Sequence, residues 1–325
     1  MIDPPLSLTP TLALATGPIP IPRRIGPSAL EVFPIALSGT VFGWTADGPT
    51  TTSILDRFVE LGGTFVDTAD AYAGGRSEIM IGNWMHSRGN RDALTIATKV
   101  GKGPDHPGLS APAIRAAVHA SLARLRIDCI DLLFLHIDDP SVSFDETLLA
   151  VDELIRAGDV RYFGGSDHTA NRLFEARIAS GQLGVAHMVA LQKHYNLVHR
   201  TEYEGDLARI AAQLDLAVLP RFALAAGFLS GKYRSRADVE RHRRGEEVAP
   251  YVTRRGFRVL AALDRVARET SSAVATVALS WLLSRPRVVA PVVSVSAARQ
   301  LDEVMAAPLT PLSRHQLTEL DRASE

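Results

Sequence analysis

Short apolar segments rich in β-branched residues recur about every 30 residues along the chain, and a longer segment with helical apolar spacing follows each of them. This alternation predicts an α/β fold with a mainly parallel sheet covered by helices. The segments with strand character are residues 34–37, 64–67, 94–98, 130–136, 160–165, 188–192, 217–221 and 288–293. Eight strand-helix units in succession predict a closed (β/α)8 barrel, the TIM barrel.

The alternative is an open, doubly wound sheet, which would need a glycine-rich turn after its first strand. The sequence there reads SGTVFGW and contains no GxGxxG, so we favour the barrel. Residues 21–325 are expected to form this single domain, and residues 1–20 an irregular leader. The segment 24–32, with Gly26 and Pro27 at its turn, predicts a β-hairpin that closes the bottom of the barrel.

Composition excludes several classes of protein. Lys and Arg total 35 against 36 Asp and Glu, a net charge of -1, so bulk charge favours neither nucleic acid nor an anionic membrane as a partner. The single cysteine, Cys129, excludes internal disulfides and cysteine-cluster metal sites, and it fits a reducing cytoplasm. No apolar segment approaches the ~18 residues that span a bilayer. We expect a cytoplasmic protein with a small-molecule partner, and a homo-oligomer is compatible with these features.

Polar residues stand where three neighbouring strands end, which is where barrels carry their chemistry. Asp67 ends the second predicted strand, Lys99 follows the third and His136 ends the fourth. Tyr72 lies in the loop just after Asp67. Each residue alone has an ordinary structural explanation, such as a helix cap, a solvated lysine or a buried histidine. Because the strands are neighbours, we expect the four side chains to meet at one mouth and form a catalytic group.

The chemistry of this group follows from its charges. An ammonium beside a tyrosine hydroxyl favours the phenolate and makes the hydroxyl a better proton donor. Lys99 supplies that ammonium and Asp67 keeps it charged, while His136 orients the substrate oxygen through a hydrogen bond. A proton donor without a nucleophile or phosphate loop suits carbonyl reduction with a separate hydride-carrying cofactor. Metal binding is the weaker interpretation, because residues 136–139 offer a single imidazole.

Six ordered segments resemble the signature segments of the aldo-keto reductase superfamily, notably the reductases related to ion-channel β subunits. They read GGTFVDTADAYAGGRSE, IATKVG, DLLFLH, VRYFGGSD, LQKHYNL and GFLSGKY, and the resemblance covers the chain from about Arg24 to its C-terminus. It implies a barrel that binds an extended nicotinamide cofactor without a Rossmann domain. It also implies a catalytic tetrad at Asp67, Tyr72, Lys99 and His136, with Tyr72 as acid in reduction and base in oxidation.

The same resemblance implies the cofactor-binding positions. They are Thr40, Ser166, Asp167, Gln192, Arg221, Leu224, Gly227, Ser230, Lys232, Ser296, Gln300 and Glu303. Ser166 and Gln192 match residues that contact the carboxamide of the cofactor. Asp167 stands where the family usually has asparagine, so its ionised side chain can accept from the carboxamide but cannot donate to it. Arg221 stands where an aromatic ring normally stacks on the nicotinamide.

Two further features concern the ends of this site. We expect no basic residue near Ser296, where several relatives have one. The arginine-rich segment 232–247 is either a solvated loop or a lid over the cofactor; the lid would bind a 2'-phosphate through Arg241, Arg243 and Arg244. Trp44, after the first strand, is the aromatic candidate for the substrate pocket, with a core or surface position as its alternative.

Together these features predict an NADPH-dependent oxidoreductase that reduces an aldehyde or ketone to an alcohol. NAD is the alternative cofactor, in a sugar or alcohol dehydrogenase built on the same scaffold. A second alternative is a cofactor-binding regulatory subunit with little turnover.

Overall fold

The computed structural model describes residues 20–241 and 245–325, and this part of the chain forms the expected barrel. Within it, eight strands make one parallel sheet in the order β10-β3-β4-β5-β6-β7-β8-β9. The strands are β3 (Ala36–Ser38), β4 (Phe65–Asp67), β5 (Thr95–Val100), β6 (Ile130–Leu135), β7 (Val160–Ser166), β8 (Ala190–His194), β9 (Ala217–Arg221) and β10 (Val292–Val293). A parallel bridge between Val218 and Val288 joins the two edges, so the barrel is nearly closed.

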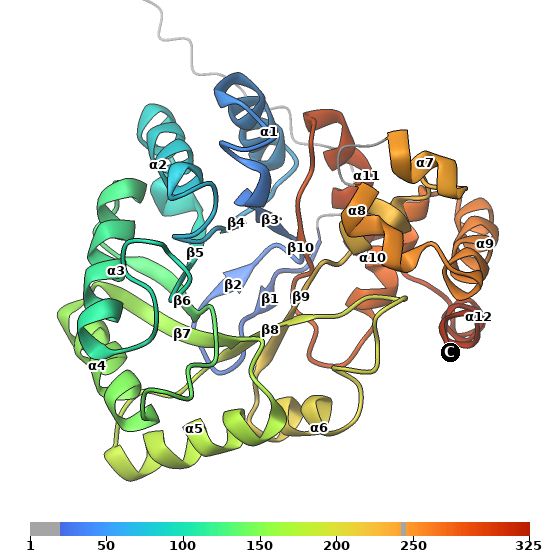
Figure 1. Ribbon diagram of the computed structural model, residues 1–325. Helices are drawn as coiled ribbons and strands as arrows, with labels where there is room; N and C mark the ends of the chain where they lie inside the picture. The colour runs from blue at the N-terminus through green and yellow to red at the C-terminus, as the bar shows by residue number, and fades with distance from the viewer. Residues whose placement is uncertain (1–19, 242–244) are drawn as a thin grey trace, which may run out of the picture.

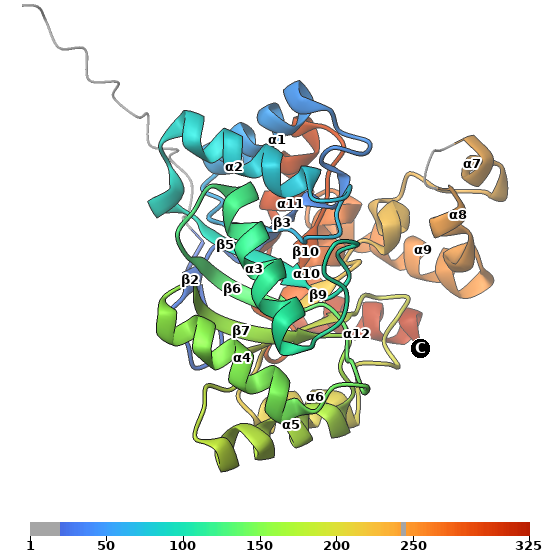
Figure 2. The ribbon, with the colours of Figure 1, turned by 60° about the vertical axis from the view of Figure 1, so that its left-hand side comes forward.

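Helices surround the strands, as Figure 1 shows. They are α1 (Gly48–Glu60), α2 (Arg76–Arg88), α3 (Ala111–Leu125), α4 (Phe144–Ala157), α5 (Ala170–Leu183), α6 (Asp206–Gln213), α7 (Arg236–Arg241), α8 (Gly245–Val248), α9 (Arg254–Glu269), α10 (Val274–Leu283), α11 (Leu301–Met305) and α12 (Arg314–Ser324). Local signals fix their ends: the Ser143 side chain accepts from the backbone of Glu146 to begin α4, and Gly158 ends it at a positive φ. The segment α7–α9 projects to one side of the barrel (Figure 2).

The last strand is shorter than the sequence predicts. The expected segment 288–293 contributes β10 only at Val292–Val293, whereas Val288 pairs with Val218 as an isolated bridge. Pro291 lies between the two parts and has no backbone N–H to donate to a neighbouring strand. Its carbonyl still accepts from the backbone N–H of Ala36 at 3.0 Å, so the chain continues along the barrel wall.

The predicted hairpin closes the bottom of the barrel. Its strands are β1 (Arg23–Arg24) and β2 (Glu31–Val32), and Ile25 and Val32 pack with the side chains that fill the barrel interior. Gly26 turns the chain at a φ of +51°, and a Cβ there would lie 2.3 Å from the carbonyl oxygen of Val189. Only glycine permits this close approach. The interior is therefore filled and covered at the bottom, which leaves the opposite end, where the strands terminate, as the place for a site.

Residues 1–19 of the expected leader lie outside the described residues. No helix in the described ranges is both long enough and apolar enough to cross a membrane.

Candidate active site

A fully buried ion pair lies at the base of the barrel mouth. Lys99 Nζ donates to Asp67 Oδ2 at 2.6 Å and to the carbonyl oxygen of Thr68 at 2.8 Å, and neither charged side chain is more than 1% exposed. Burial disfavours the charged form of Lys99, but the Asp67 carboxylate and Tyr72 outweigh this and raise the pKa of the lysine. The lysine is therefore a fixed cation beneath the mouth.

Tyr72 and His136 lie above this pair. The Lys99 ammonium is 5.0 Å from the centroid of the Tyr72 ring. His136 follows β6 directly, where its backbone N–H donates to the carbonyl oxygen of Val100 at 2.9 Å. The two rings meet edge to face, with centroids 6.0 Å apart and an interplanar angle of 83°. The structure thus brings together the four side chains of the predicted tetrad, while their catalytic roles stay predictions.

His136 is held as a neutral imidazole. Burial lowers its pKa to about 2, and the positive charges of Lys99, Lys102 and Arg221 add to this effect. Its Nδ1 is buried and has no hydrogen-bond partner among the described residues. Near physiological pH the neutral ring can donate one hydrogen bond to a ligand and accept another, and it does not become a cation.

Buried polar contacts that the sequence did not reveal position the Tyr72 loop. Ser77, at the start of α2, donates to the carbonyl oxygen of Gly39 at 2.9 Å and contacts the hydroxyl of Thr68 at 2.8 Å. Glu78 is fully buried, where it accepts from Thr98 at 2.6 Å and from Arg124 at 2.7 Å. The segment GGRSE contains both residues but does not predict their burial, because serine and glutamate at the start of a helix usually face solvent.

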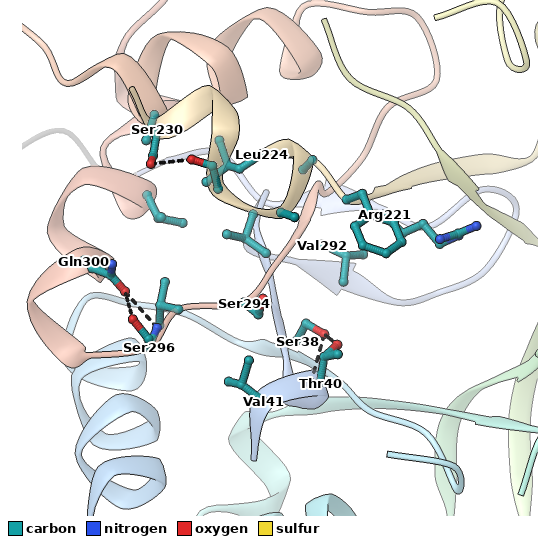
Figure 3. A pocket seen from close by; sticks show the side chains of 18 of the residues that line it. Ser38, Thr40, Val41, Arg221, Leu224, Ser230, Val292, Ser294, Ser296 and Gln300 are labelled. Atoms are coloured by element: carbon teal, nitrogen blue, oxygen red, sulfur yellow. Dashed lines mark hydrogen bonds between the residues drawn. The ribbon is translucent and has the colours of Figure 1, made fainter. Parts of the chain in front are cut away.

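A cavity of about 590 Å³ opens at this mouth. Tyr72 and His136 line it, together with eleven residues of the expected cofactor site: Thr40, Asp167, Gln192, Arg221, Leu224, Gly227, Ser230, Lys232, Ser296, Gln300 and Glu303. Figure 3 shows Arg221 at one end and the hydrogen-bonded pair of Ser296 and Gln300 at the other. Ser166 is not among the lining residues, although it ends β7 beside Gln192, and its buried hydroxyl has no hydrogen-bond partner among the described residues. An elongated cavity with polar groups at both ends fits an extended dinucleotide.

Arg221 and Asp167, the two positions that depart from the family pattern, bind each other. Arg221 Nη2 donates to both carboxylate oxygens of Asp167, at 3.0 and 2.9 Å, and its Nε lies 3.2 Å from Oδ1. Each side chain is 29% exposed. Asp167 follows β7 at a φ of +59° and Arg221 ends β9, so the pair reaches across the end of β8. Sequence separation concealed this pairing, since the two residues are 54 positions apart.

Several predicted residues lie elsewhere or outside the description. Trp44 is 54% exposed and does not line the cavity, although its neighbour Thr45 does. The Arg241 side chain and residues 243 and 244 are outside the described part of the chain.

Two cations in the cavity wall were missed by sequence reasoning. Arg299 lines the cavity three residues after Ser296, because the turn η5 (Ala298–Gln300) brings it round, so the expectation that no basic residue lies near Ser296 is wrong. A search at helical spacing would have found it. Lys102 lines the opposite end near His136 and carries no motif signal.

Comparison with known proteins extends this description. The model of the aldo/keto reductase family matches residues 38–325. Norsolorinic acid reductase B of Dothistroma septosporum is 29% identical to the chain over 93% of it and 81% of the relative. A norsolorinic acid reductase of Emericella nidulans is 31% identical over 95% of the chain and 84% of the relative. A protein of Arabidopsis thaliana named probable voltage-gated potassium channel subunit beta is 30% identical over 88% and 90%.

Proposed function

The chain belongs to the aldo/keto reductase family, and from this premise we propose that it reduces an aldehyde or ketone to the alcohol with NADPH, with Tyr72 as the proton donor. Family membership establishes an oxidoreductase that uses a nicotinamide cofactor. The observation that carries the finer proposal is the buried pair of Lys99 and Asp67 beneath Tyr72, with a neutral His136 beside it.

Each residue of the tetrad has a separate role in the transfer of one proton. The Tyr72 hydroxyl donates its proton to the carbonyl oxygen of the substrate as that oxygen gains charge. Lys99 stabilises the phenolate that is left, and Asp67 holds the ammonium in place. His136 donates its one ring N–H to the same carbonyl oxygen and orients it. The nicotinamide cofactor, when bound, supplies the hydride.

The cofactor would lie along the cavity. Ser166 and Gln192 are suited to the carboxamide, and the buried, unpartnered hydroxyl of Ser166 supports this. The remaining proposed contacts are Thr40, Asp167 and Arg221 toward the nicotinamide, Leu224, Gly227, Ser230 and Lys232 along the pyrophosphate, and Ser296, Gln300 and Glu303 at the adenosine end. NADP is preferred over NAD because Arg299, which has no ion-pair partner among the described residues, lines the cavity beside Ser296 and suits a 2'-phosphate.

The substrate would enter above Tyr72. Trp44 is proposed as a substrate contact, because its neighbour Thr45 lines the cavity and its exposed indole is available to a ligand. The single cysteine of the chain, Cys129, supports a cytoplasmic location.

Replacing Tyr72 tests the proposal, because Tyr72→Phe keeps the ring and removes only the hydroxyl. We expect kcat for aldehyde reduction to fall at least ~100-fold, with the Kd of NADPH nearly unchanged. The measurement is steady-state kinetics on a panel of aldehydes, ketones and sugars, in both directions and with both cofactors. A variant that keeps more than half the wild-type rate would remove Tyr72 from the role of proton donor.

The same panel separates the rival functions. Faster oxidation of sugars or alcohols with NAD would identify a dehydrogenase. Uniformly slow turnover, together with a stable protein partner in a pull-down, would identify a regulatory subunit.

A further inference from the structure

We propose that the substrate carries an anionic group, such as a carboxylate, and that Lys102 binds this group at the mouth of the cavity. The inference rests on the proposed function, because it names the substrate class of the same site. Lys102 and His136 line one cavity together with Tyr72, so a ligand that reaches the tyrosine hydroxyl passes the ammonium.

The fold places Lys102 by two close backbone approaches. Gly101 and Gly103 flank it in the loop after β5. A Cβ on Gly101, at a φ of +111°, would lie 2.9 Å from the side chain of Leu109, and a Cβ on Gly103 would lie 2.5 Å from Asp70. The N–H of Gly108 donates to the carbonyl oxygen of Gly101 at 2.9 Å and closes the loop. Gly101 adopts a positive φ that favours glycine, and a side chain at either position would have to displace Leu109 or Asp70, so the two glycines permit the tight loop that presents Lys102 at the mouth.

The other cations around the substrate end are held in ion pairs, whereas Lys102 is not. Lys99 is matched by Asp67, and Arg221 is matched by Asp167. Lys102 forms no ion pair with any described residue, and Asp70, the acid packed under Gly103, lies beyond ion-pair distance of it. The Lys102 ammonium is therefore not neutralised by an ion pair where the substrate enters, and the buried Asp70 carboxyl acts on it only from a distance.

The neutral form of His136 agrees with an excess of positive charge at this end of the cavity. After burial and Lys99, the charges of Lys102 and Arg221 are what lower the pKa of its imidazole. The same positive field that opposes a proton on His136 favours an anion beside it. A carbonyl compound with an acidic group would gain from this field, and its neutral ester would not.

Matched substrate pairs test the inference directly. We would compare 4-carboxybenzaldehyde with methyl 4-formylbenzoate, and two further acid and ester pairs of different length, at saturating NADPH. Wild-type enzyme is expected to favour the best acid over its ester, with a preference that weakens as salt is added. Lys102→Gln should lower kcat/KM for the acid about tenfold, mainly through KM, and leave the ester unchanged.

Two control variants isolate the charge of Lys102. Lys102→Arg keeps the charge and should retain the preference for the acid. Arg268→Gln removes one positive charge from the exposed side of α9, which does not line the cavity, and should change kcat/KM for neither the acid nor the ester.

A binding measurement keeps this inference separable from the proposed function. Calorimetry of 4-(hydroxymethyl)benzoate with the enzyme saturated in NADP⁺ should show about tenfold weaker binding in Lys102→Gln than in wild type. If no aldehyde is reduced but this difference is present, the proposed reaction fails and the anion site stands. Equal kcat/KM for acids and esters, with equal carboxylate binding in both proteins, would overturn the inference.

Discussion

The two sides of the barrel mouth hold their charges in different ways. On the side formed by β4 to β6, the ion pair of Lys99 and Asp67 is sealed from solvent. On the side formed by β7 to β9, the pair of Arg221 and Asp167 has the same kind of partners but is almost one-third exposed. In a buried ion pair each charge is stabilised mainly by the opposite charge, because no water can reach it. In an exposed ion pair each side chain can exchange the opposite charge for water or a ligand. The first side is built to stay fixed and the second to adapt.

Breaking each pair should therefore have unequal effects on stability, and this is the largest effect we expect. Lys99→Met leaves the Asp67 carboxylate buried without its cation, which costs about 3–5 kcal/mol in free energy of unfolding. Arg221→Gln leaves Asp167 in contact with water and should cost at most about 1 kcal/mol. Urea denaturation at pH 7 measures both. Similar losses of unfolding free energy in the two variants would show that burial does not make the first ion pair more important for stability than the second.

The histidine on the fixed side should make the protein sensitive to acid. The folded pKa of His136 is about 2, and the ordinary value near 6.5 applies when the chain unfolds. The unfolded state therefore binds the proton more readily, so stability is lost as the pH falls below about 6.5. By pH 5 this loss reaches about 2 kcal/mol.

Replacing the histidine checks this sign. His136→Gln should flatten the decline in unfolding free energy between pH 7 and pH 5. A decline as steep as that of the wild type would assign the acid sensitivity to other groups, among which His194 also has a lowered pKa, about 4, chiefly through burial.

Asp70 is the exception on the fixed side, since it is buried without a cation paired to it. Burial, helped by the charge of Glu78, raises its pKa to about 6, and the nearby backbone N–H groups of Gly101 and Gly103 offset only part of this effect. A carboxyl with a raised folded pKa contributes stability that is lost as the pH rises from 4 through 6. Asp70→Asn should therefore unfold at higher urea than wild type at pH 8, by about 1–2 kcal/mol, and the gain should vanish near pH 4. A gain that is independent of pH would point to packing instead.

The contrast between the sides also explains what the sequence could predict. Asp67, Lys99 and His136 stand at the ends of neighbouring strands, and the βα repeat alone makes neighbours of such residues, so their convergence was predictable. The pairing of Asp167 with Arg221 was not, because their strands are separated by β8 and the pairing depends on side-chain direction. Lys102 escaped for a similar reason, because a loop brings it into the cavity and loop conformation has no periodic signal in sequence. Arg299, in contrast, stands one helical turn after Ser296 and could have been found from its spacing.

The smallest expected effect tests whether the adaptable pair tunes the cofactor. The oxidised nicotinamide ring is a cation and the reduced ring is neutral, so charge near it changes their relative affinity. With Arg221 and Asp167 paired, the two charges offset each other. Asp167→Asn leaves the guanidinium uncompensated and should weaken oxidised relative to reduced cofactor about fivefold, or about 1 kcal/mol at a partly exposed site. Arg221→Gln leaves the carboxylate and should shift the ratio of the two affinities in the opposite direction.

The double variant should return close to the wild-type ratio, since both charges are gone. Fluorescence titrations of the oxidised and the reduced cofactor into wild type, the two single variants and the double variant complete this double-mutant cycle. Shifts of the same sign in the two single variants would mean that the pair acts on the cofactor through shape, not charge.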